Sequence, residues 1–186
     1  MKSITCIYYL SLSTRNRLEE VAEFKYLGSI VTNDGSSQRE ILSRIAQARL
    51  AFNKMKFLKV GSVDLELRKR LVRSHVWSVV MYGSEAWILR KTELNRLEAL
   101  EMWCWRRLLG ISWKDKVTNV EVLNRVGETG GELVSRIMKG KKQWLTEVVN
   151  RKNQLVQQII EGKIDGKRGR GRPRIGRLDW VKVQGG

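Results

Sequence analysis

The spacing of apolar positions in the first half of the chain predicts two amphipathic helices. Apolar residues recur at intervals of four or three positions after Ser37, which is the period of one helical face, and a second helix with its own core face is expected at about 64–82. The first stripe is Ile41, Ile45, Ala48, Phe52 and Met55, and the second is Leu67, Leu71, His75, Val76 and Val79. Ser37, followed three residues later by Glu40, predicts a capping box at the first helix. Asp64 is a suitable start for the second helix.

A third segment, 93–109, is apolar around most of its circumference and is therefore expected at the centre of the domain. Its apolar residues are Leu94, Leu97, Leu100, Met102, Trp103, Trp105, Leu108 and Leu109. Thr92 is a suitable N-cap for this helix. Further on, Thr118 with Glu121 predicts a second capping box, and Gly127 suits the position just past a helix end.

The two ends of the chain differ from this helical middle. Residues 21–35 combine residues that favour strands with the turn sequence Asn33-Asp34-Gly35, which predicts a strand followed by a turn. Helices are expected over 132–150 and 152–161, after a hinge at Gly130-Gly131. Residues 163–174 hold six basic residues and one acid, so this tail is expected to be disordered when free.

These patterns predict a mainly α-helical bundle with a short N-terminal β segment and a disordered basic C-terminal tail. The expected boundaries are a β-rich region at 1–35, a helical domain at 36–127, a helical extension at 128–162 and the tail at 163–186. The apolar run Ile4 to Leu12 fits either a buried strand or a signal peptide. Two lone cysteines, Cys6 and Cys104, indicate a reducing compartment rather than a disulfide framework.

The charge balance points to an anionic partner. Thirty-six Lys and Arg residues against nineteen Asp and Glu residues give a net charge of +17. Binding of basic side chains to phosphates releases condensed counterions, so nucleic acid is the first expectation. An acidic membrane surface comes second, and a basic ribosomal-type or structural protein is a further alternative. No run approaches the ~20 apolar residues that a membrane span needs.

The side chains that could carry chemistry are sparse. The five aspartates are dispersed, with no adjacent pair to hold the two metal ions of a polymerase site. No Cys/His cluster or phosphate-binding glycine loop is present, and no cofactor is expected. His75 and Cys104 are interpreted as core residues. The tryptophans at 77, 87, 103, 105 and 113 could stack on bases, but most are interpreted as core because they fall within apolar helices.

The tail carries the sharpest motif, Arg170-Gly171-Arg172-Pro173. Glycine adds no side chain that would clash with groove walls, proline stiffens an extended backbone, and arginines can enter the narrow minor groove of A·T-rich DNA. The segment resembles an AT-hook. An unspecific basic tail or a nuclear-import signal would have a similar composition.

Several segments together resemble the C-terminal part of the endonuclease–reverse transcriptases of non-LTR retrotransposons. They are FKYLGS at 24–29 with Asp34-Gly35, LRKRLVRSHVWSVVMYGSEAW at 67–87, LEALEMWCWRR at 97–107, ISW at 111–113 and IIEGKIDGKRGRGRPR at 159–174. The resemblance covers about 18–180, whereas 1–17 do not match. The run at 144–147 also departs from the family, since it lacks the usual histidine.

The resemblance implies that 1–35 is the end of a polymerase palm, that 36–127 is a thumb and that the catalytic YADD-type motif lies upstream. We therefore expect no polymerase activity from this chain, and expect it to hold a template–primer duplex of DNA or RNA, with a catalytic reverse transcriptase subunit as a further partner. A nuclear location is expected, or a cytoplasmic one with nuclear import. The candidate contacts are Lys25, Arg39, Arg68, Lys69, Arg70, Arg73, Arg106, Arg107, Lys167, Arg168, Arg170, Arg172 and Arg174. A stand-alone AT-hook-type DNA-binding protein and a non-functional truncated copy remain alternatives.

Overall fold

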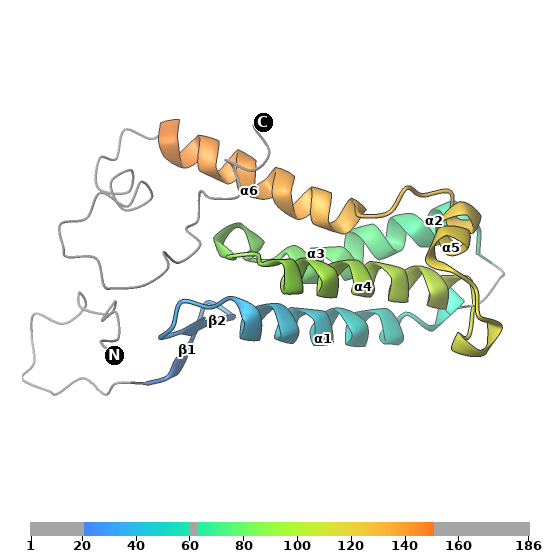
Figure 1. Cartoon of the computed structure of the whole chain (residues 1–186), viewed down its shortest axis with the longest axis horizontal. Coiled ribbons are helices and arrows are strands. Elements are labelled where there is room, and N and C mark those ends of the chain that lie inside the picture. Colours follow the sequence, from blue (N-terminus) through green and yellow to red (C-terminus); the bar gives the residue numbers. More distant parts are fainter. Residues whose placement is uncertain (1–20, 60–62, 151–186) are drawn as a thin grey trace, which may run out of the picture.

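A computed structural model describes residues 21–59 and 63–150, which form a helical bundle with a β-hairpin at one end (Figure 1). This mainly α-helical architecture confirms the predicted fold class. The strands are β1 (Glu23–Tyr26) and β2 (Ser29–Thr32), and the long helices are α1 (Gln38–Lys54), α4 (Lys91–Leu108) and α6 (Glu132–Asn150). The remaining elements are η1 (Lys56–Lys59), α2 (Leu65–Leu71), η2 (Val72–Val76), α3 (Trp77–Met81), η3 (Ser84–Ala86), η4 (Trp113–Asp115) and α5 (Asn119–Val126).

The hairpin confirms the strand and turn predicted for 21–35. Strands β1 and β2 pair antiparallel, with Glu23 opposite Thr32 and Tyr26 opposite Ser29. The two residues that join them, Leu27 and Gly28, both have positive φ angles, 46° and 83°. Two consecutive residues with positive φ match the right-handed twist of a tight hairpin, and glycine accepts this conformation without strain.

Two side chains of α1 attach the hairpin to the bundle. The Glu40 carboxylate accepts hydrogen bonds from Ile30 N (2.6 Å) and Arg44 Nε (2.7 Å), and Arg44 Nη2 donates to Gly28 O (2.7 Å). The predicted capping box of Ser37 and Glu40 is therefore wrong. Ser37 Oγ instead accepts from Ile88 N (2.9 Å), because the hairpin and the α3–α4 connection both converge on the start of α1.

The second predicted helix, 64–82, is a helical run with a π-helical turn, η2, between α2 and α3. Asp64 caps it as expected, with its carboxylate accepting from Glu66 N and Leu67 N. The predicted buried face is correct for Val76, which is buried, and for Leu71 and Val79, which pack against the core. It is wrong for Leu67, which is 40% exposed, and for His75, which is also exposed. The π turn adds a residue to one turn and rotates the two parts of the run relative to each other, so the buried face shifts along it. The buried residues are Lys69, Val72, Val76, Trp77 and Val80.

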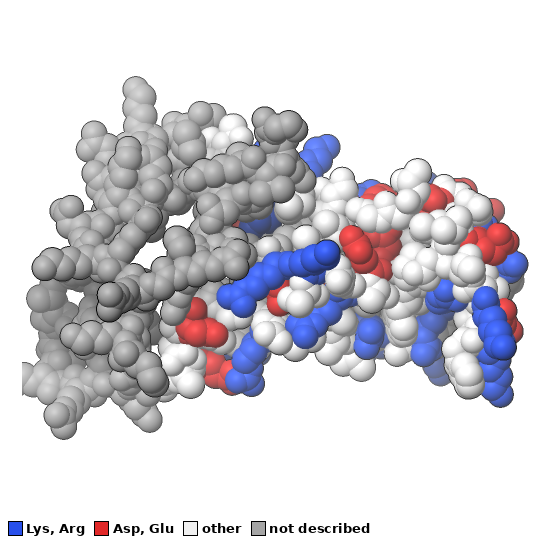
Figure 2. All heavy atoms as spheres, in the orientation of Figure 1, with Lys and Arg blue, Asp and Glu red and all other residues white. Residues whose placement is uncertain are grey.

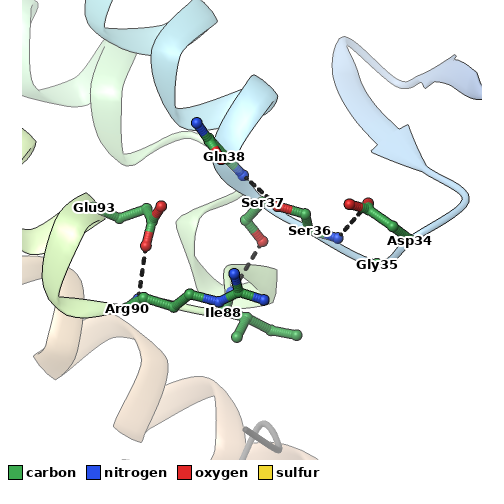
Figure 3. Close-up of a pocket in the computed structure, with 8 residues that line it drawn as sticks. All are labelled: Asp34, Gly35, Ser36, Ser37, Gln38, Ile88, Arg90 and Glu93. Carbon is green, nitrogen blue, oxygen red and sulfur yellow. Dashed lines mark hydrogen bonds between the residues drawn. The ribbon is translucent and has the colours of Figure 1, made fainter. Parts of the chain in front are cut away.

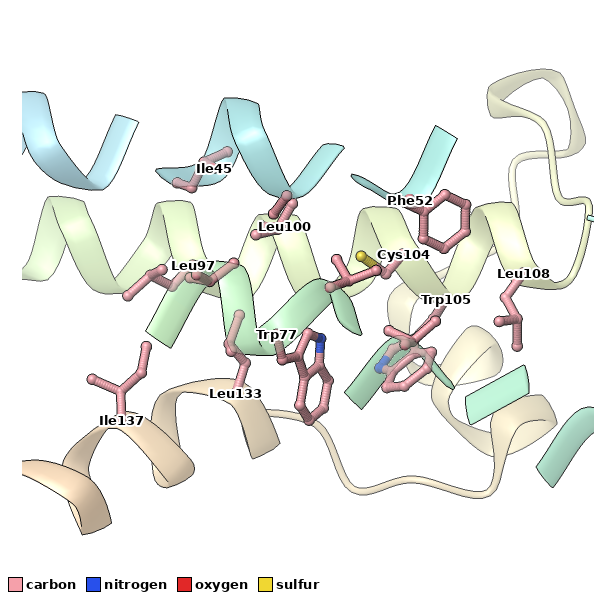
Figure 4. Packing of buried hydrophobic residues seen from close by; sticks show 14 of the residues in the cluster. Ile45, Phe52, Trp77, Leu97, Leu100, Cys104, Trp105, Leu108, Leu133 and Ile137 are labelled. Atoms are coloured by element: carbon pink, nitrogen blue, oxygen red, sulfur yellow. The ribbon is translucent and has the colours of Figure 1, made fainter. Parts of the chain in front are cut away.

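Helix α4 lies at the centre of the bundle, as predicted, although Asn95, Glu98 and Ala99 leave one side of it exposed. It contacts α1, α5, α6 and η1. Figure 4 shows its Leu97, Leu100 and Trp105 facing side chains from the surrounding helices. The Trp77 and Trp105 rings meet edge to face, with their centroids 5.6 Å apart. The helix starts two residues earlier than a Thr92 cap requires, because Glu93 Oε2 accepts from Arg90 N and makes Arg90 the N-cap.

Helices α5 and α6 close the bundle. Thr118 Oγ1 accepts from Glu121 N and so caps α5, which ends at Gly127 in the left-handed conformation (φ 72°). Helix α6 receives its cap from another helix, since the buried carboxylate of Glu101 on α4 accepts from the backbone amides of residues 132 and 133. Burial raises the pKa of Glu101, although these two amide hydrogen bonds act in the opposite direction.

The described part of the expected helical extension, residues 128–150, contributes to the core of the bundle. Leu133 and Ile137 of α6 are buried in the same hydrophobic cluster as Trp77 and Leu97. The predicted helix 152–161, the tail 163–186 and the apolar run near the N-terminus lie outside the described residues.

Replacement of Trp105 by alanine should lower the free energy of unfolding by about 3–5 kcal/mol, because the side chain is fully buried in the central helix. Trp103 is only partly buried, so Trp103→Ala should cost clearly less. Urea unfolding of the two variants beside the parent measures the difference. Equal losses would contradict the placement of Trp103 at the margin of the core.

Candidate nucleic-acid interface

The predicted basic contacts fall into two groups, and one group is engaged inside the fold. Lys69 is 4% exposed, and its Nζ contacts Glu66 Oε1 (2.7 Å), Glu128 Oε1 (2.8 Å) and the carbonyl oxygen of Val126 (2.9 Å). Arg73 donates to Glu128 (2.6 Å) and Glu132 (2.9 Å). These contacts join α2 and η2 to the start of α6, so both cations serve the fold.

The electrostatics of this network agree with a structural role. Burial acts to lower the pKa of Lys69, but hydrogen bonds with Glu128 and Glu66 outweigh it and raise the pKa overall. Burial likewise acts to raise the pKa of Glu128, and hydrogen bonds from Lys69 and Arg73 lower it overall. Each partner therefore stabilises the charged form of the others.

Two further predicted contacts hold backbone carbonyl groups. Arg68 Nη1 donates to Leu108 O (2.9 Å) at the end of α4 and to Leu58 O (3.3 Å). Arg106 Nη2 donates to Val117 O (2.8 Å) and to Asn119 Oδ1 (2.8 Å). Arg68 and Arg106 therefore fix loop ends, each through one of its terminal guanidinium nitrogens.

The other predicted contacts within the described chain lie on the surface. Lys25 is exposed on β1, and Arg39 is exposed on α1 while paired with Glu23 at 2.5 Å. Arg70 and Arg107 are exposed, and within residues 21–59 and 63–150 neither forms an ion pair. Lys167, Arg168, Arg170, Arg172 and Arg174 lie outside the described residues.

The most distinctive surface cluster consists of Arg49, Trp103 and Arg107, called here the Arg–Trp–Arg cluster. The guanidinium carbons of Arg49 and Arg107 lie 5.4 Å and 4.7 Å from the centre of the Trp103 ring. Phe52 supports this ring from the core side, edge to face at 5.2 Å. In the described part of the chain no carboxylate pairs with either guanidinium, so the cluster presents concentrated positive charge on a fixed aromatic surface.

More basic residues lie at the same end of the bundle, where α1 and α4 both terminate (Figure 1). The exposed residues there are Lys54, Lys56, Lys114 and Lys116. Figure 2 shows basic side chains reaching the end of the bundle that lies away from the grey atoms. This end is the candidate nucleic-acid interface.

Sequence reasoning included Arg107 but missed Arg49, Lys54, Lys56, Lys114 and Lys116. The four-residue spacing of Trp103 and Arg107 already indicated that the two share a helical face. Nothing local placed Arg49 beside them, because it comes from a different helix and its position depends on the packing of α1 against α4.

A small pocket opens where the turn after β2 meets the α3–α4 connection (Figure 3). Its polar groups hold the junction together. Asp34 Oδ1 accepts from Ser36 N (2.9 Å), Ser37 Oγ from Ile88 N, and Glu93 from Arg90 N. These contacts indicate a structural junction rather than a ligand site.

The two residues considered for catalysis have different surroundings. His75 was expected in the core but is exposed on η2, with its Nδ1 2.8 Å from Ser74 Oγ. Cys104 is buried as expected, and burial raises the pKa of its thiol to about 12. Within the described residues no group of three or more His, Cys, Asp or Glu is placed to hold a metal ion. No described helix combines the length and apolar character of a membrane span.

One comparison with known proteins is informative. The chain is 28% identical over 153 residues to an uncharacterised transposon-derived protein of Caenorhabditis elegans, a match that covers 79% of this chain. The chain spans about half (53%) of that relative. No family model matches the sequence, and no solved structure matches it. The similarity supports an origin in a transposable element.

The internal position of Lys69 can be tested against its exposed neighbour Arg70. Lys69→Met should lower the free energy of unfolding by about 1–3 kcal/mol, because it removes buried hydrogen bonds and leaves Val126 O without its donor. Arg70→Met should change it by less than about 0.5 kcal/mol, as is usual for an exposed site. Thermal unfolding of both variants measures this, and equal stability of the two would contradict the network.

Proposed function

We propose that this chain is the thumb-type, nucleic-acid-binding part of a retroelement reverse transcriptase, and that it holds a template–primer duplex without the paired aspartates of the catalytic site. The transposon-derived relative supports the origin, and the order of the FKYLGS, LRKRLVRSHVWSVVMYGSEAW and ISW segments supports the narrower assignment. The helical bundle behind a palm-like hairpin is compatible with this role.

The observation that carries the binding proposal is the Arg–Trp–Arg cluster. Two guanidinium groups on one indole repel each other unless an anion lies between them or beside them. Guanidinium groups bind phosphate oxygens in a bidentate manner and stack on aromatic rings, so the cluster suits a nucleic-acid backbone. Phosphate contacts position a duplex without reading its sequence. The proposed partner is therefore any duplex of suitable shape, and the proposed location is nuclear.

The double variant Arg49→Ala/Arg107→Ala should weaken duplex binding and should reduce the slope of log affinity against log salt by about two, since each lost phosphate contact accounts for about 0.9 of the slope. Fluorescence anisotropy across a salt series measures both quantities. The matched control is Lys139→Ala/Lys142→Ala, which removes the same charge from α6. Equal effects of the two double variants would show that only net charge matters.

A second candidate function, a stand-alone AT-hook-type protein, rests on the Arg170-Gly171-Arg172-Pro173 sequence. The two functions differ in the part of the chain that binds the duplex, which is the helical bundle in the first and the tail in the second. Under the thumb proposal, a chain lacking 163–186 keeps its duplex binding through the bundle, although with a smaller salt slope.

Under the AT-hook alternative, Arg170→Lys/Arg172→Lys should reduce the preference for A·T-rich over G·C-rich duplex. It should leave the salt slope nearly unchanged, because lysine keeps the charge but not the planar fork. Anisotropy on the two duplexes makes the measurement. A parent chain that binds both duplexes equally would remove the AT-hook alternative.

A further inference from the structure

Trp113 is the most exposed of the large hydrophobic residues in the described chain, with 84% of its surface accessible. It lies on η4, in the loop between α4 and α5, at the end of the bundle opposite the hairpin (Figure 1). Trp77, Trp87 and Trp105 are buried, which agrees with the interpretation of most of the tryptophans as core, and Trp113 is the exposed exception. An indole left this exposed contributes almost nothing to folding.

The loop that carries Trp113 is held in a defined shape. Ser112 N donates to Asp115 Oδ2 (2.6 Å), and Asp115 N donates back to Ser112 O (3.2 Å), so the residues on either side of Trp113-Lys114 are joined. Arg106 fastens the loop at both ends, because its carbonyl accepts from Ile111 N (2.9 Å) and its guanidinium holds Val117 O. The indole is thus presented on a constrained turn.

Two exposed lysines lie close to Trp113 in the sequence. The one acidic residue of the turn, Asp115, directs its carboxylate to the backbone of Ser112. Lys114 and Lys116 are exposed, and neither forms an ion pair within the described part of the chain. Lys116 has a φ of 49°, a left-handed conformation that is uncommon for a lysine and reverses the chain direction there.

An exposed aromatic ring flanked by cations fits a ligand that combines a flat ring with an anion, which describes a nucleotide. Lysine is depleted in protein–protein interfaces, whereas stacking aromatics in positively charged grooves are typical of single-strand binding. A base inside a duplex is covered on both faces by its neighbours, so only an unpaired or terminal base can offer a face to Trp113.

We propose that Trp113 stacks on an unpaired base of a nucleic-acid strand whose phosphates lie against Lys114 and Lys116. This inference rests on the proposed function and narrows it, since it adds a single-stranded region to the duplex. The bundle would then recognise a junction between paired and unpaired strands rather than a uniform duplex.

The test compares the full chain with its Trp113→Ala variant on a blunt duplex and on the same duplex with a single-stranded extension. The parent should bind the extended duplex more tightly. Trp113→Ala should lose about 5- to 150-fold on the extended duplex, the range for loss of one stacking aromatic, and almost nothing on the blunt duplex. Trp113→Phe should retain most of the affinity. The control Val120→Ala, at another exposed apolar position near this end, should change neither ligand's affinity.

The outcomes separate the two proposals. A parent chain that binds both duplexes equally, or a Trp113→Ala variant that binds the extended duplex as the parent does, overturns the stacking inference and leaves the proposed function standing. A parent that binds the extended duplex but not the blunt duplex, and loses the binding with Trp113→Ala, supports stacking and overturns the duplex grip. A parent that binds neither ligand overturns both. Circular dichroism melting should be the same for all four proteins, because the residues changed are exposed.

Discussion

The structure depends on burial of the apolar face of α4. Leu97, Leu100 and Trp105 lie on this face, whereas Asn95, Glu98 and Ala99 on the opposite side are exposed. Leaving the apolar face in water would cause a large loss of hydrophobic stabilisation. Helices α1, α5 and α6 and the turn η1 meet this requirement from different directions. The central helix also carries Glu101, whose buried carboxylate holds the amides at the start of α6. One helix therefore organises both the apolar core and the docking of the last described helix.

The large positive charge of the chain overstates the number of cations available to a partner. Lys69 and Arg73 neutralise carboxylates between helices, and Arg68 and Arg106 hold backbone carbonyl groups. Among the exposed cations, Arg49, Lys54, Lys56, Arg107, Lys114 and Lys116 lie toward the end where α1 and α4 terminate. The proposed interface consists of cations from the second group, because a guanidinium that has no partner within the described fold keeps its hydrogen-bond donors for phosphate.

The sequence predicted the long helices well, because Ile41, Ile45, Ala48 and Phe52 follow the α-helical period that the backbone adopts. It predicted α4 as the centre for a different reason, because apolar residues occur around most of the circumference of this helix. The sequence prediction failed where a side chain with the spacing of a local cap bonds instead to a distant part of the chain. Glu40 had the spacing of a capping residue, yet the hairpin amide of Ile30 was closer to its carboxylate. Of the candidate site, Arg107 was recognisable, whereas Arg49 reaches Trp103 only through helix packing.

The π-helical turn η2 has a consequence for changes in chain length. A π turn holds one residue more than an α-helical turn, so a one-residue deletion within 72–76 would restore a regular helix with complete backbone hydrogen bonding. The deletion would also rotate α2 relative to α3 by about 100°, the angle between successive residues of an α-helix. Lys69 would turn away from Glu128 while Trp77 stayed against Trp105. A one-residue deletion in 72–76 would therefore keep this segment helical. It would, however, break the ion pair of Lys69 with Glu128 while the contact between Trp77 and Trp105 remained.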